Sequence, residues 1–333
     1  MSDLFWKDLP ALVTGITGFV GSSLAARLVG LKARVVGLVR DDVAGSSFHQ
    51  LGLEHAVTVV HGSLEDYPLL ARTVNEYAVE VVYHLGAQTI VGTANRSPLS
   101  TFKSNIEGTW NLLEACRAHP GIRAVVVASS DKAYGTHKDL PYHEDFLLNP
   151  EYPYDVSKAC ADLLARSYFK TYGLPVVITR FANIYGPGDL NFSRIIPDTI
   201  QSVLQGRPPV IRSDGTPERD FLWIDDAIDA YLLMAEQIDT PGVKGEAFNA
   251  GSGKPVHILA LVGEIIRLSG NHTLQPDIRG NVPPHGEINR QYLDVSKIRQ
   301  VLGWEPKVPL EDGLKRVMDW YVGYLAHRGS PRA

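Results

Sequence analysis

The sequence predicts an α/β fold: a doubly wound parallel sheet with a smaller C-terminal substrate-binding lobe. Apolar, β-rich runs alternate with helical patterns up to Phe181, as is typical of a parallel sheet covered by helices on both faces. A glycine-punctuated turn follows the first run, where a Rossmann-type fold binds a dinucleotide. Beyond Phe181 the pattern loosens into loops rich in Pro and Gly. We therefore expect a dinucleotide-binding domain over 1–181 and a substrate lobe over 182–333, with some chain returning to the first domain.

The expected elements follow one another along the chain. Six runs have the length and composition of buried strands: Ala11–Thr14, Arg34–Val39, Val57–His61, Val79–His84, Ala124–Ser129 and Val176–Phe181. Segments with apolar positions at helical spacing are Ser22–Val29, Leu69–Glu76, Thr101–Arg117, Tyr154–Tyr172, Ile196–Leu204 and Asp225–Glu236. Because ligands of such folds bind at the carboxyl ends of the strands, the chemistry is expected in a cleft between sheet and lobe.

Composition excludes several classes of protein. The chain has 333 residues, 44% of them apolar, and a net charge of -5, which argues against a general nucleic-acid binder. No apolar run reaches the length of a membrane span, and the first ten residues contain no signal-peptide core. The two cysteines form no disulfide framework, and the eleven histidines show no metal-ligand spacing. We expect a cytoplasmic enzyme without a metal and without a membrane or nucleic-acid partner.

The turn after the first strand has the spacing Gly-x-x-Gly-x-x-Gly. Gly15 permits the tight turn, Gly18 lets the backbone approach a pyrophosphate, and Gly21 permits close packing of helix on strand. The phosphates would lie at the positive end of the helix that begins near Phe19. The expected cofactor contacts of this turn are Gly15, Thr17, Gly18, Phe19, Val20 and Gly21.

Three residues form a candidate hydride-transfer triad. Tyr154 would be the base that takes a hydroxyl proton, and Lys158, one helical turn later, would keep the phenol acidic. Ser130, at the end of the fifth expected strand, would hold the reacting oxygen. Oxidation of an alcohol needs no further side chain.

Two additional proton carriers follow the serine directly. Asp131 could protonate a leaving hydroxyl and Lys132 could remove a carbon-bound proton. The alternative is that they are only an exposed ion pair at the end of a strand. As catalytic groups they would add dehydration to oxidation.

Together these motifs resemble a known family. The glycine turn, His84-Leu85-Gly86-Ala87-Gln88, Ser129-Ser130-Asp131-Lys132, Tyr154-x-x-x-Lys158, Arg180-x-x-Asn183-x-Tyr185-Gly186-Pro187-Gly188 and Arg219-Asp220-Phe221 look like the extended short-chain dehydrogenase/reductases that act on nucleotide sugars. The resemblance covers nearly the whole chain in the right order. The Ser-Asp-Lys sequence is most similar to the CDP-glucose 4,6-dehydratase type.

The resemblance implies a reaction. An NDP-hexose 4,6-dehydratase would oxidise C4, eliminate water across C5–C6 and return hydride to C6, giving an NDP-4-keto-6-deoxyhexose. An NDP-sugar 4-epimerase is the alternative, because epimerisation needs the triad without the acid and base pair. A net reductase and a non-enzymatic binding protein are further alternatives, although the latter would be expected to have lost the triad.

The resemblance also implies further contacts to the cofactor. Arg40 follows the second strand, where it could hold the 2′-phosphate of NADP, while Asp41 could instead bind the ribose hydroxyls of NAD. We expect NAD and leave NADP open. Ser63 stands where the family usually has an aspartate near adenine, so a weaker contact is expected there. The remaining expected cofactor contacts are Leu64, Leu85, Ala87, Gln88, Tyr154 and Lys158.

Substrate contacts and assembly complete the expectations. Arg219 and Arg194 could clamp a pyrophosphate, and Asn183 could donate to a phosphate or sugar oxygen. Asn105 resembles a structural asparagine that holds a helix near the active site. The helices expected over 101–117 and 154–172 have apolar stripes, and the equivalent pair forms a four-helix dimer contact in related enzymes. We therefore expect a homodimer.

Overall fold

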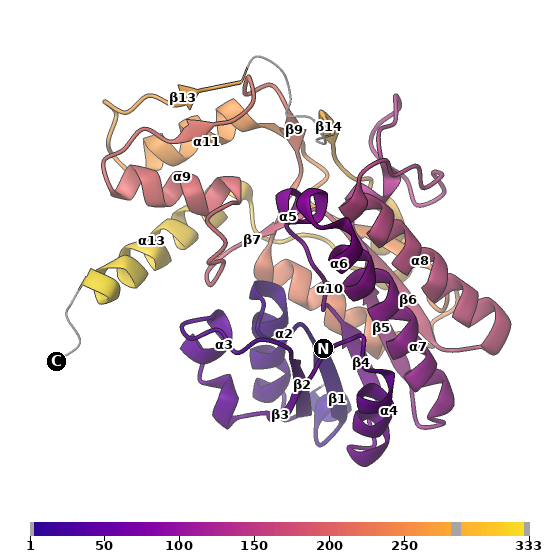
Figure 1. The fold of residues 1–333 in the computed structure, drawn as a ribbon. Coiled ribbons are helices and arrows are strands. Elements are labelled where there is room, and N and C mark those ends of the chain that lie inside the picture. The colour runs from indigo at the N-terminus through magenta and orange to yellow at the C-terminus, as the bar shows by residue number, and fades with distance from the viewer. Residues whose placement is uncertain (1–2, 281–287, 330–333) are drawn as a thin grey trace.

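A seven-stranded parallel sheet forms the centre of the computed structural model, which describes residues 3–280 and 288–329 (Figure 1). Its strand order is β11-β6-β5-β4-β1-β2-β3. The bounds are β1 (Pro10–Thr14), β2 (Arg34–Val39), β3 (Thr58–His61), β4 (Val81–His84), β5 (Ala124–Ala128), β6 (Val176–Phe181) and β11 (Ala247–Ala250). The doubly wound Rossmann-type sheet predicted from the sequence is confirmed.

Helices cover both faces of this sheet, because the strands are apolar on both faces. One face packs on α2 (Phe19–Gly30) and α10 (Ile224–Glu236). The other packs on α4 (Tyr67–Glu76), α7 (Gly108–Ala118) and α8 (Pro153–Tyr172). None of the described helices is both long enough and apolar enough to cross a bilayer.

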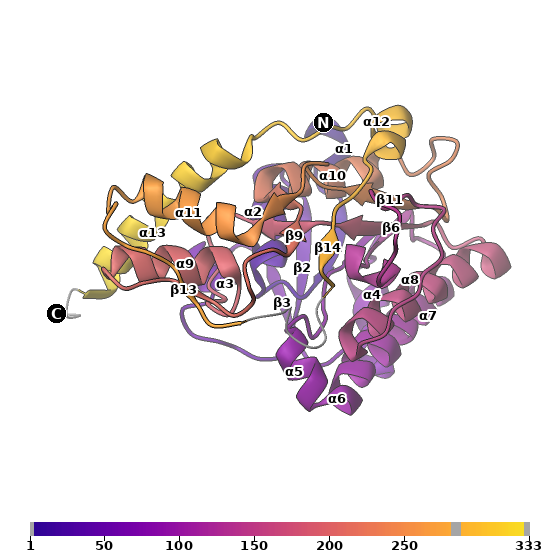
Figure 2. The same cartoon turned by 90° about the horizontal axis from the view of Figure 1, so that it is seen from above.

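Short strands and three helices build the C-terminal lobe beside the sheet (Figure 2). Strand β7 (Asn183–Tyr185) pairs with β10 (Phe221–Trp223), and β8 (Val210–Ile211) pairs with β13 (Asp277–Ile278). Strand β9 (Glu218–Arg219) lies between β12 (Val256–His257) and β14 (Arg290–Gln291). The helices of the lobe are α9 (Ile195–Leu204), α11 (Ile258–Leu268) and α13 (Leu310–Gly329).

The chain returns from the lobe to the large sheet. Strand β11 pairs with β6 in parallel, and α12 (Ser296–Leu302) packs against β11. The remaining short elements are α1 (Asp3–Trp6), α3 (Ser47–Gln50), η1 (Leu53–His55), α5 (Val91–Arg96), α6 (Pro98–Phe102), η2 (Lys103–Glu107) and η3 (Asp131–Tyr134). Strand β11 comes from the part of the sequence where no sheet strand was predicted.

One predicted helix is interrupted. The segment expected to be a single helix over 101–117 consists of α6, a π-helical turn η2 and α7. Asn105 lies in that turn, where its side chain bonds Gln88 on one side and Ser157 on the other. Extra residues in a helical turn are a common device at functional sites, because they re-aim one side chain without ending the helix.

Candidate active site

A cleft of about 920 Å³ lies at the carboxyl ends of β5 and β6, and residues of the C-terminal lobe form its opposite wall. All five candidate catalytic residues line it: Ser130, Asp131, Lys132, Tyr154 and Lys158. So do all three candidate substrate residues, Asn183, Arg194 and Arg219, and the candidate cofactor residues Val20 and Leu85. The other candidate cofactor residues are not among its lining residues: Gly15, Thr17, Gly18, Phe19, Gly21, Arg40, Ser63, Leu64, Ala87 and Gln88. The structure thus gathers the proposed chemistry in one place.

The glycine turn has the shape that a dinucleotide requires. Gly15 has φ +68°, and a Cβ on Gly21 would lie 2.1 Å from the Gly15 oxygen, so neither position tolerates a side chain. A Cβ on Gly18 would meet only that same oxygen, at 3.3 Å. Helix α2 begins directly after Gly18 with no side-chain cap, which leaves its first N–H groups to an anion. The backbone therefore fits a pyrophosphate.

A buried histidine, His84, joins the end of β1 to helix α7 beside this turn. The Thr109 hydroxyl donates to the Asn105 carbonyl at 2.6 Å, so it must accept its 2.9 Å bond from the Nε2–H of His84. The Nδ1 of His84 then accepts from the Thr14 hydroxyl at 3.0 Å, which itself accepts from the Gly86 N–H. Burial lowers the pKa of His84 to about 3, so the ring is neutral. His84 is a structural link rather than a proton carrier.

Asn105 extends this link to the helix that carries the triad. Its Oδ1 accepts from the Gln88 N–H at 2.7 Å, and its Nδ2 donates to the Gln88 carbonyl and to the Ser157 hydroxyl. Ser157 in turn donates to the Tyr154 carbonyl at 2.7 Å. The loop after β4 and the first turn of α8 are therefore held at a fixed distance.

The triad residues come from two elements. Ser130 follows β5 and caps η3, while Tyr154 and Lys158 lie one turn apart on α8. The Lys158 ammonium donates to the Ala128 carbonyl at 2.8 Å, and burial lowers the pKa of Lys158 to about 8. The Ser130 hydroxyl is a hydrogen-bond partner of the Tyr154 phenol.

The phenol is not acidified by the protein alone. Burial raises the pKa of Tyr154 above its ordinary value, and this effect outweighs the hydrogen bond from Ser130 that lowers it. Lys158 was expected to favour the phenolate together with the positive nicotinamide; in the structure its ammonium donates to the Ala128 carbonyl. An additional positive charge in the cleft is needed to favour the phenolate.

Asp131 and Lys132 lie on the single 3₁₀ turn that follows Ser130. Asp131 is almost completely buried, and burial raises the pKa of its carboxyl to about 6. The Ser130 hydroxyl donates to Asp131 Oδ1 at 3.0 Å. That hydroxyl has one proton, so it can donate a hydrogen bond to Asp131 or to Tyr154, but not to both at once. A carboxyl with this pKa can both hold and release a proton near neutral pH.

The candidate substrate residues are held by neighbouring acceptors. Arg194 forms a 3.0 Å ion pair with the buried Asp189, and the Asn183 amide donates to the Asp220 carbonyl at 3.2 Å. Arg219 donates to the carbonyls of Glu218 and Asn289, at 2.9 and 3.0 Å. Two arginines that line the cleft from different segments suit bidentate recognition of phosphate.

The remaining cofactor-side candidates lie around the glycine turn. Arg40 forms an exposed ion pair with Asp41 at 2.7 Å. Ser63 donates a hydrogen bond to Glu65. Leu64 packs where both Gly86 and Gly108 lack a Cβ, so these glycines make room for it.

Two features were missed in the sequence. The hydroxyls of Thr14 and Thr109 orient His84, and the only sequence signal was that Thr109 follows Asn105 by one helical turn. Arg96 and Arg212 also line the cleft, although no motif or spacing marks them. Within residues 3–280 and 288–329, no cluster of His, Cys, Asp and Glu has the composition to hold a metal ion.

Comparison with known proteins decides the family. A family model described as GDP-mannose 4,6 dehydratase matches residues 12–317. The chain belongs to this family. Among other members, a CDP-glucose 4,6-dehydratase of Salmonella typhimurium is 29% identical over 96% of this chain and 92% of its own. The predicted resemblance to nucleotide-sugar dehydratases and epimerases is confirmed.

Family members differ in length and in activity. A trifunctional UDP-glucose 4,6-dehydratase of Arabidopsis thaliana is 30% identical over 97% of this chain, which spans about half of that protein's length (48%). A dTDP-glucose 4,6-dehydratase from Streptomyces venezuelae, solved with NAD, is 30% identical over 96% of this chain and 98% of its own, with a TM-score of 0.85. A UDP-glucose 4-epimerase from Thermotoga maritima is 28% identical over 95% and 100%, with a TM-score of 0.87.

Proposed function

We propose that this chain is an NAD-dependent nucleotide-sugar 4,6-dehydratase that forms an NDP-4-keto-6-deoxyhexose. The observation that carries the proposal is the position of Asp131 and Lys132, which line the same cleft as the triad on the turn directly after Ser130. A 4-epimerase needs no acid and base pair there. The dehydratases among the relatives support the same reaction.

The first half of the reaction is assigned to the triad. Tyr154 takes the proton of the C4 hydroxyl, while Ser130 holds the C4 oxygen by a hydrogen bond. The chemistry that bound NAD supplies is reversible storage of a hydride, taken from C4 and returned to C6, and a positive ring charge that favours the phenolate. The glycine turn and the uncapped start of α2 would hold its pyrophosphate, and Lys158 follows Tyr154 by one turn of α8.

The second half is assigned to the turn η3. A ketone at C4 makes the C5 proton acidic, and Lys132 is the base that removes it. Asp131 gives its proton to the C6 hydroxyl, which leaves as water while the C5–C6 double bond forms. Lys132 returns a proton to C5 as C6 is reduced. Burial of Asp131 raises its pKa to about 6, so a larger fraction of this carboxyl is protonated near neutral pH than for an exposed aspartate.

A panel of nucleotide sugars tests this assignment. The purified chain is incubated with NAD and CDP-, GDP-, UDP- or dTDP-hexoses, and the products are weighed by mass spectrometry. We expect one of them to lose water. A product of unchanged mass that contains a different sugar would instead establish the 4-epimerase, and consumption of free reduced cofactor would establish a reductase.

We also propose a homodimer built on α7 and α8, which lie side by side on the outside of the sheet (Figure 1). Trp110 on α7 is 43% exposed and Leu163 on α8 is 58% exposed, so both helices present a large apolar side chain to the surface. Pairing of the two helices with their copies would bury both residues. Light scattering tests this, and a monomer mass for the parent chain would contradict it.

The division of labour and the compartment are part of the same proposal. Residues 1–181 would bind the dinucleotide and 182–333 mainly the nucleotide sugar. Two free cysteines, one of them buried, suit the reducing cytoplasm. Limited proteolysis with and without each ligand would map the division.

A further inference from the structure

An ion pair lies fully buried behind the turn that carries Asp131 and Lys132. The Arg180 guanidinium donates to Asp162 Oδ2 at 2.7 Å and to Asp162 Oδ1 at 3.2 Å. Arg180 is 1% exposed and Asp162 is 0% exposed. Arg180 comes from β6 and Asp162 from α8, so the pair crosses from the sheet to the helix of the triad.

The pair contacts the last residue of that turn. Arg180 Nη1 donates to the Tyr134 hydroxyl at 2.9 Å, and the guanidinium carbon lies 4.8 Å from the centre of the Tyr134 ring. The Tyr134 hydroxyl donates in turn to Asn249 Oδ1 at 2.7 Å. Tyr134 is completely buried, so these two partners fix its side chain in one place.

The turn itself is short and is held at its two ends. Two backbone bonds of 3.1 Å close it, from the Ala133 N–H to Ser130 and from the Gly135 N–H to Lys132. Ser130 caps its start by accepting from the Lys132 N–H. Tyr134 anchors its end, so displacement of Tyr134 would rotate both Asp131 and Lys132 relative to the cleft.

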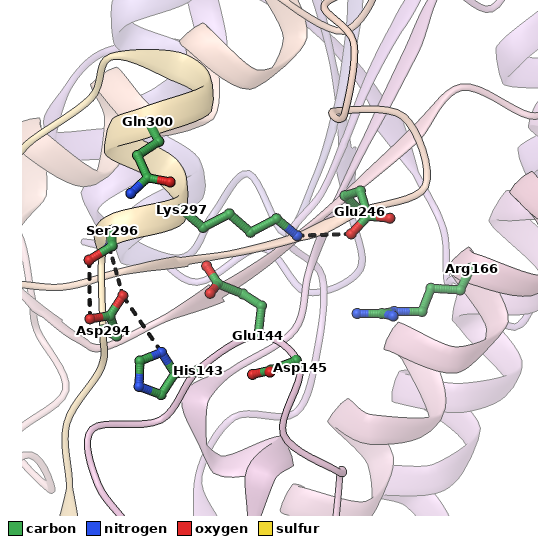
Figure 3. Close-up of a pocket in the computed structure, with 9 residues that line it drawn as sticks. All are labelled: His143, Glu144, Asp145, Arg166, Glu246, Asp294, Ser296, Lys297 and Gln300. Atoms are coloured by element: carbon green, nitrogen blue, oxygen red, sulfur yellow. Dashed lines mark hydrogen bonds and ion pairs between the residues drawn. The ribbon is translucent and has the colours of Figure 1, made fainter.

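The same network reaches a second cavity, of about 410 Å³, between α8, α12 and the loop that precedes α8. Arg180 Nη1 donates to the Glu144 carbonyl at 3.1 Å, and Glu144 Oε1 accepts from the Asn249 N–H at 2.8 Å. Figure 3 shows the Glu144 side chain among those that line this cavity. The Tyr134 hydroxyl is therefore held directly by Arg180 of β6 and Asn249 of β11. Asp162 on α8 and Glu144 in the loop that precedes α8 hold these two partners in turn.

Stability is a poor explanation for this arrangement. The free energy needed to desolvate a buried ion pair is about as large as the attraction between its charges. Apolar residues of the same volume often give the folded state equal stability. The directional contacts of a guanidinium, by contrast, specify the position of a partner closely. The pair is thus better suited to placing Tyr134 than to holding the fold together.

We propose that Arg180, held by Asp162, is a positioning residue that acts through the Tyr134 hydroxyl to fix the Asp131–Lys132 turn against the cleft. The consequence for catalysis rests on the dehydratase function proposed above. Loss of the contact should then impair elimination of water and spare oxidation at C4, because Tyr154 and Lys158 lie on α8 and Ser130 lies at the opposite end of the turn from Tyr134.

Tyr134→Phe is the decisive variant, because it removes the hydroxyl and keeps the ring. Hydrogen exchange measured by mass spectrometry should be about tenfold faster in peptides covering 130–136 and unchanged elsewhere. Rapid mixing with a nucleotide hexose and NAD should show reduced cofactor forming at the parent rate, while loss of water slows roughly 10- to 100-fold. Tyr168→Phe is the matched control, since it removes a tyrosine hydroxyl from α8 that bonds Glu114 away from the cleft.

Several outcomes would overturn the proposal. One is a hydrogen-exchange rate over 130–136 in Tyr134→Phe that equals that of the parent. Another is a rate of oxidation that falls as much as the rate of elimination. Arg180→Lys keeps the charge and loses the forked contact, so it should also slow elimination relative to oxidation. If the parent releases no water from any nucleotide hexose, the dehydratase function fails, and the exchange measurement still decides whether Tyr134 fixes the turn.

Discussion

The Lys158 ammonium donates a hydrogen bond to the backbone carbonyl of Ala128, at 2.8 Å. Ala128 is the last residue of β5, so this bond ties the helix of the triad to the strand that leads into Ser129 and Ser130. The bond also places a cation inside the protein, where burial lowers the pKa of Lys158 to about 8.

This burial predicts a dependence of stability on pH. The folded pKa of about 8 lies below the ordinary 10.5, so the unfolded chain binds more protons between these values and the free energy of unfolding rises with pH there. Below about pH 8 the contribution is constant. Relative to Lys158→Met, the parent should gain about 2 kcal/mol between pH 8 and 9.5 in urea titrations. An unchanged difference would show that the lysine is not desolvated.

Asp131 predicts the opposite slope. Its folded pKa of about 6 exceeds the ordinary 3.8, so the folded chain binds more protons in that window and the free energy of unfolding falls as pH rises through it. Asp131→Asn should therefore be about 3 kcal/mol more stable than the parent at pH 7.5 and no more stable near pH 3.5. If Asp131→Asn is less stable than the parent at pH 7.5, burial of the Asp131 carboxylate does not destabilise the folded protein.

Tyr154→Phe should abolish turnover and leave binding of NAD and of nucleotide nearly intact. The ring still packs, but the base that takes the C4 proton is lost, which removes a factor of roughly 10² to 10⁴. Calorimetry supplies the binding measurement and product analysis the rate. Near-normal turnover would remove Tyr154 from the mechanism.

Lys132→Ala and Asp131→Asn should still oxidise C4 and then stall. Reduced cofactor should accumulate in the near-ultraviolet absorbance together with a 4-ketohexose that keeps its C6 hydroxyl. Lys132→Ala should also exchange the C5 proton with heavy water more slowly, because the base is missing. Dehydration at the parent rate in both variants would make the pair structural and favour the epimerase.

Arg40 and Asp41 predict the choice of cofactor. Asp41 pairs with the Arg40 guanidinium that could otherwise bind the 2′-phosphate of NADP, and the negative charge of Asp41 repels that phosphate. Asp41→Asn should therefore improve the affinity for NADP relative to NAD by about tenfold or less, since exposed pairs contribute only about 1 kcal/mol. Asp42→Asn is the control, because Asp42 pairs with His49 instead. An equal ratio in both variants would place the cofactor's ribose elsewhere.

Much of this protein is determined by local sequence. The alternation of strands and helices predicted the parallel sheet, because buried strands and amphipathic helices each need a distinctive residue pattern. The glycine spacing predicted the turn at Gly15, since its φ of +68° and the 2.1 Å approach at Gly21 demand glycine. Tyr154 and Lys158 were predicted to share one face because they are one helical turn apart.

Tertiary structure decided everything that depends on burial or on distant partners. Tyr134 and Asn249 are 115 residues apart, and β11 pairs with β6 although β7 to α10 lie between them in the sequence, so no local pattern predicts either contact. The same holds for protonation, because burial raises the pKa of the Tyr154 phenol and lowers that of Lys158, and no spacing in the sequence indicates either shift. Desolvation is a property of the packed molecule, because it depends on which segments exclude water from a side chain.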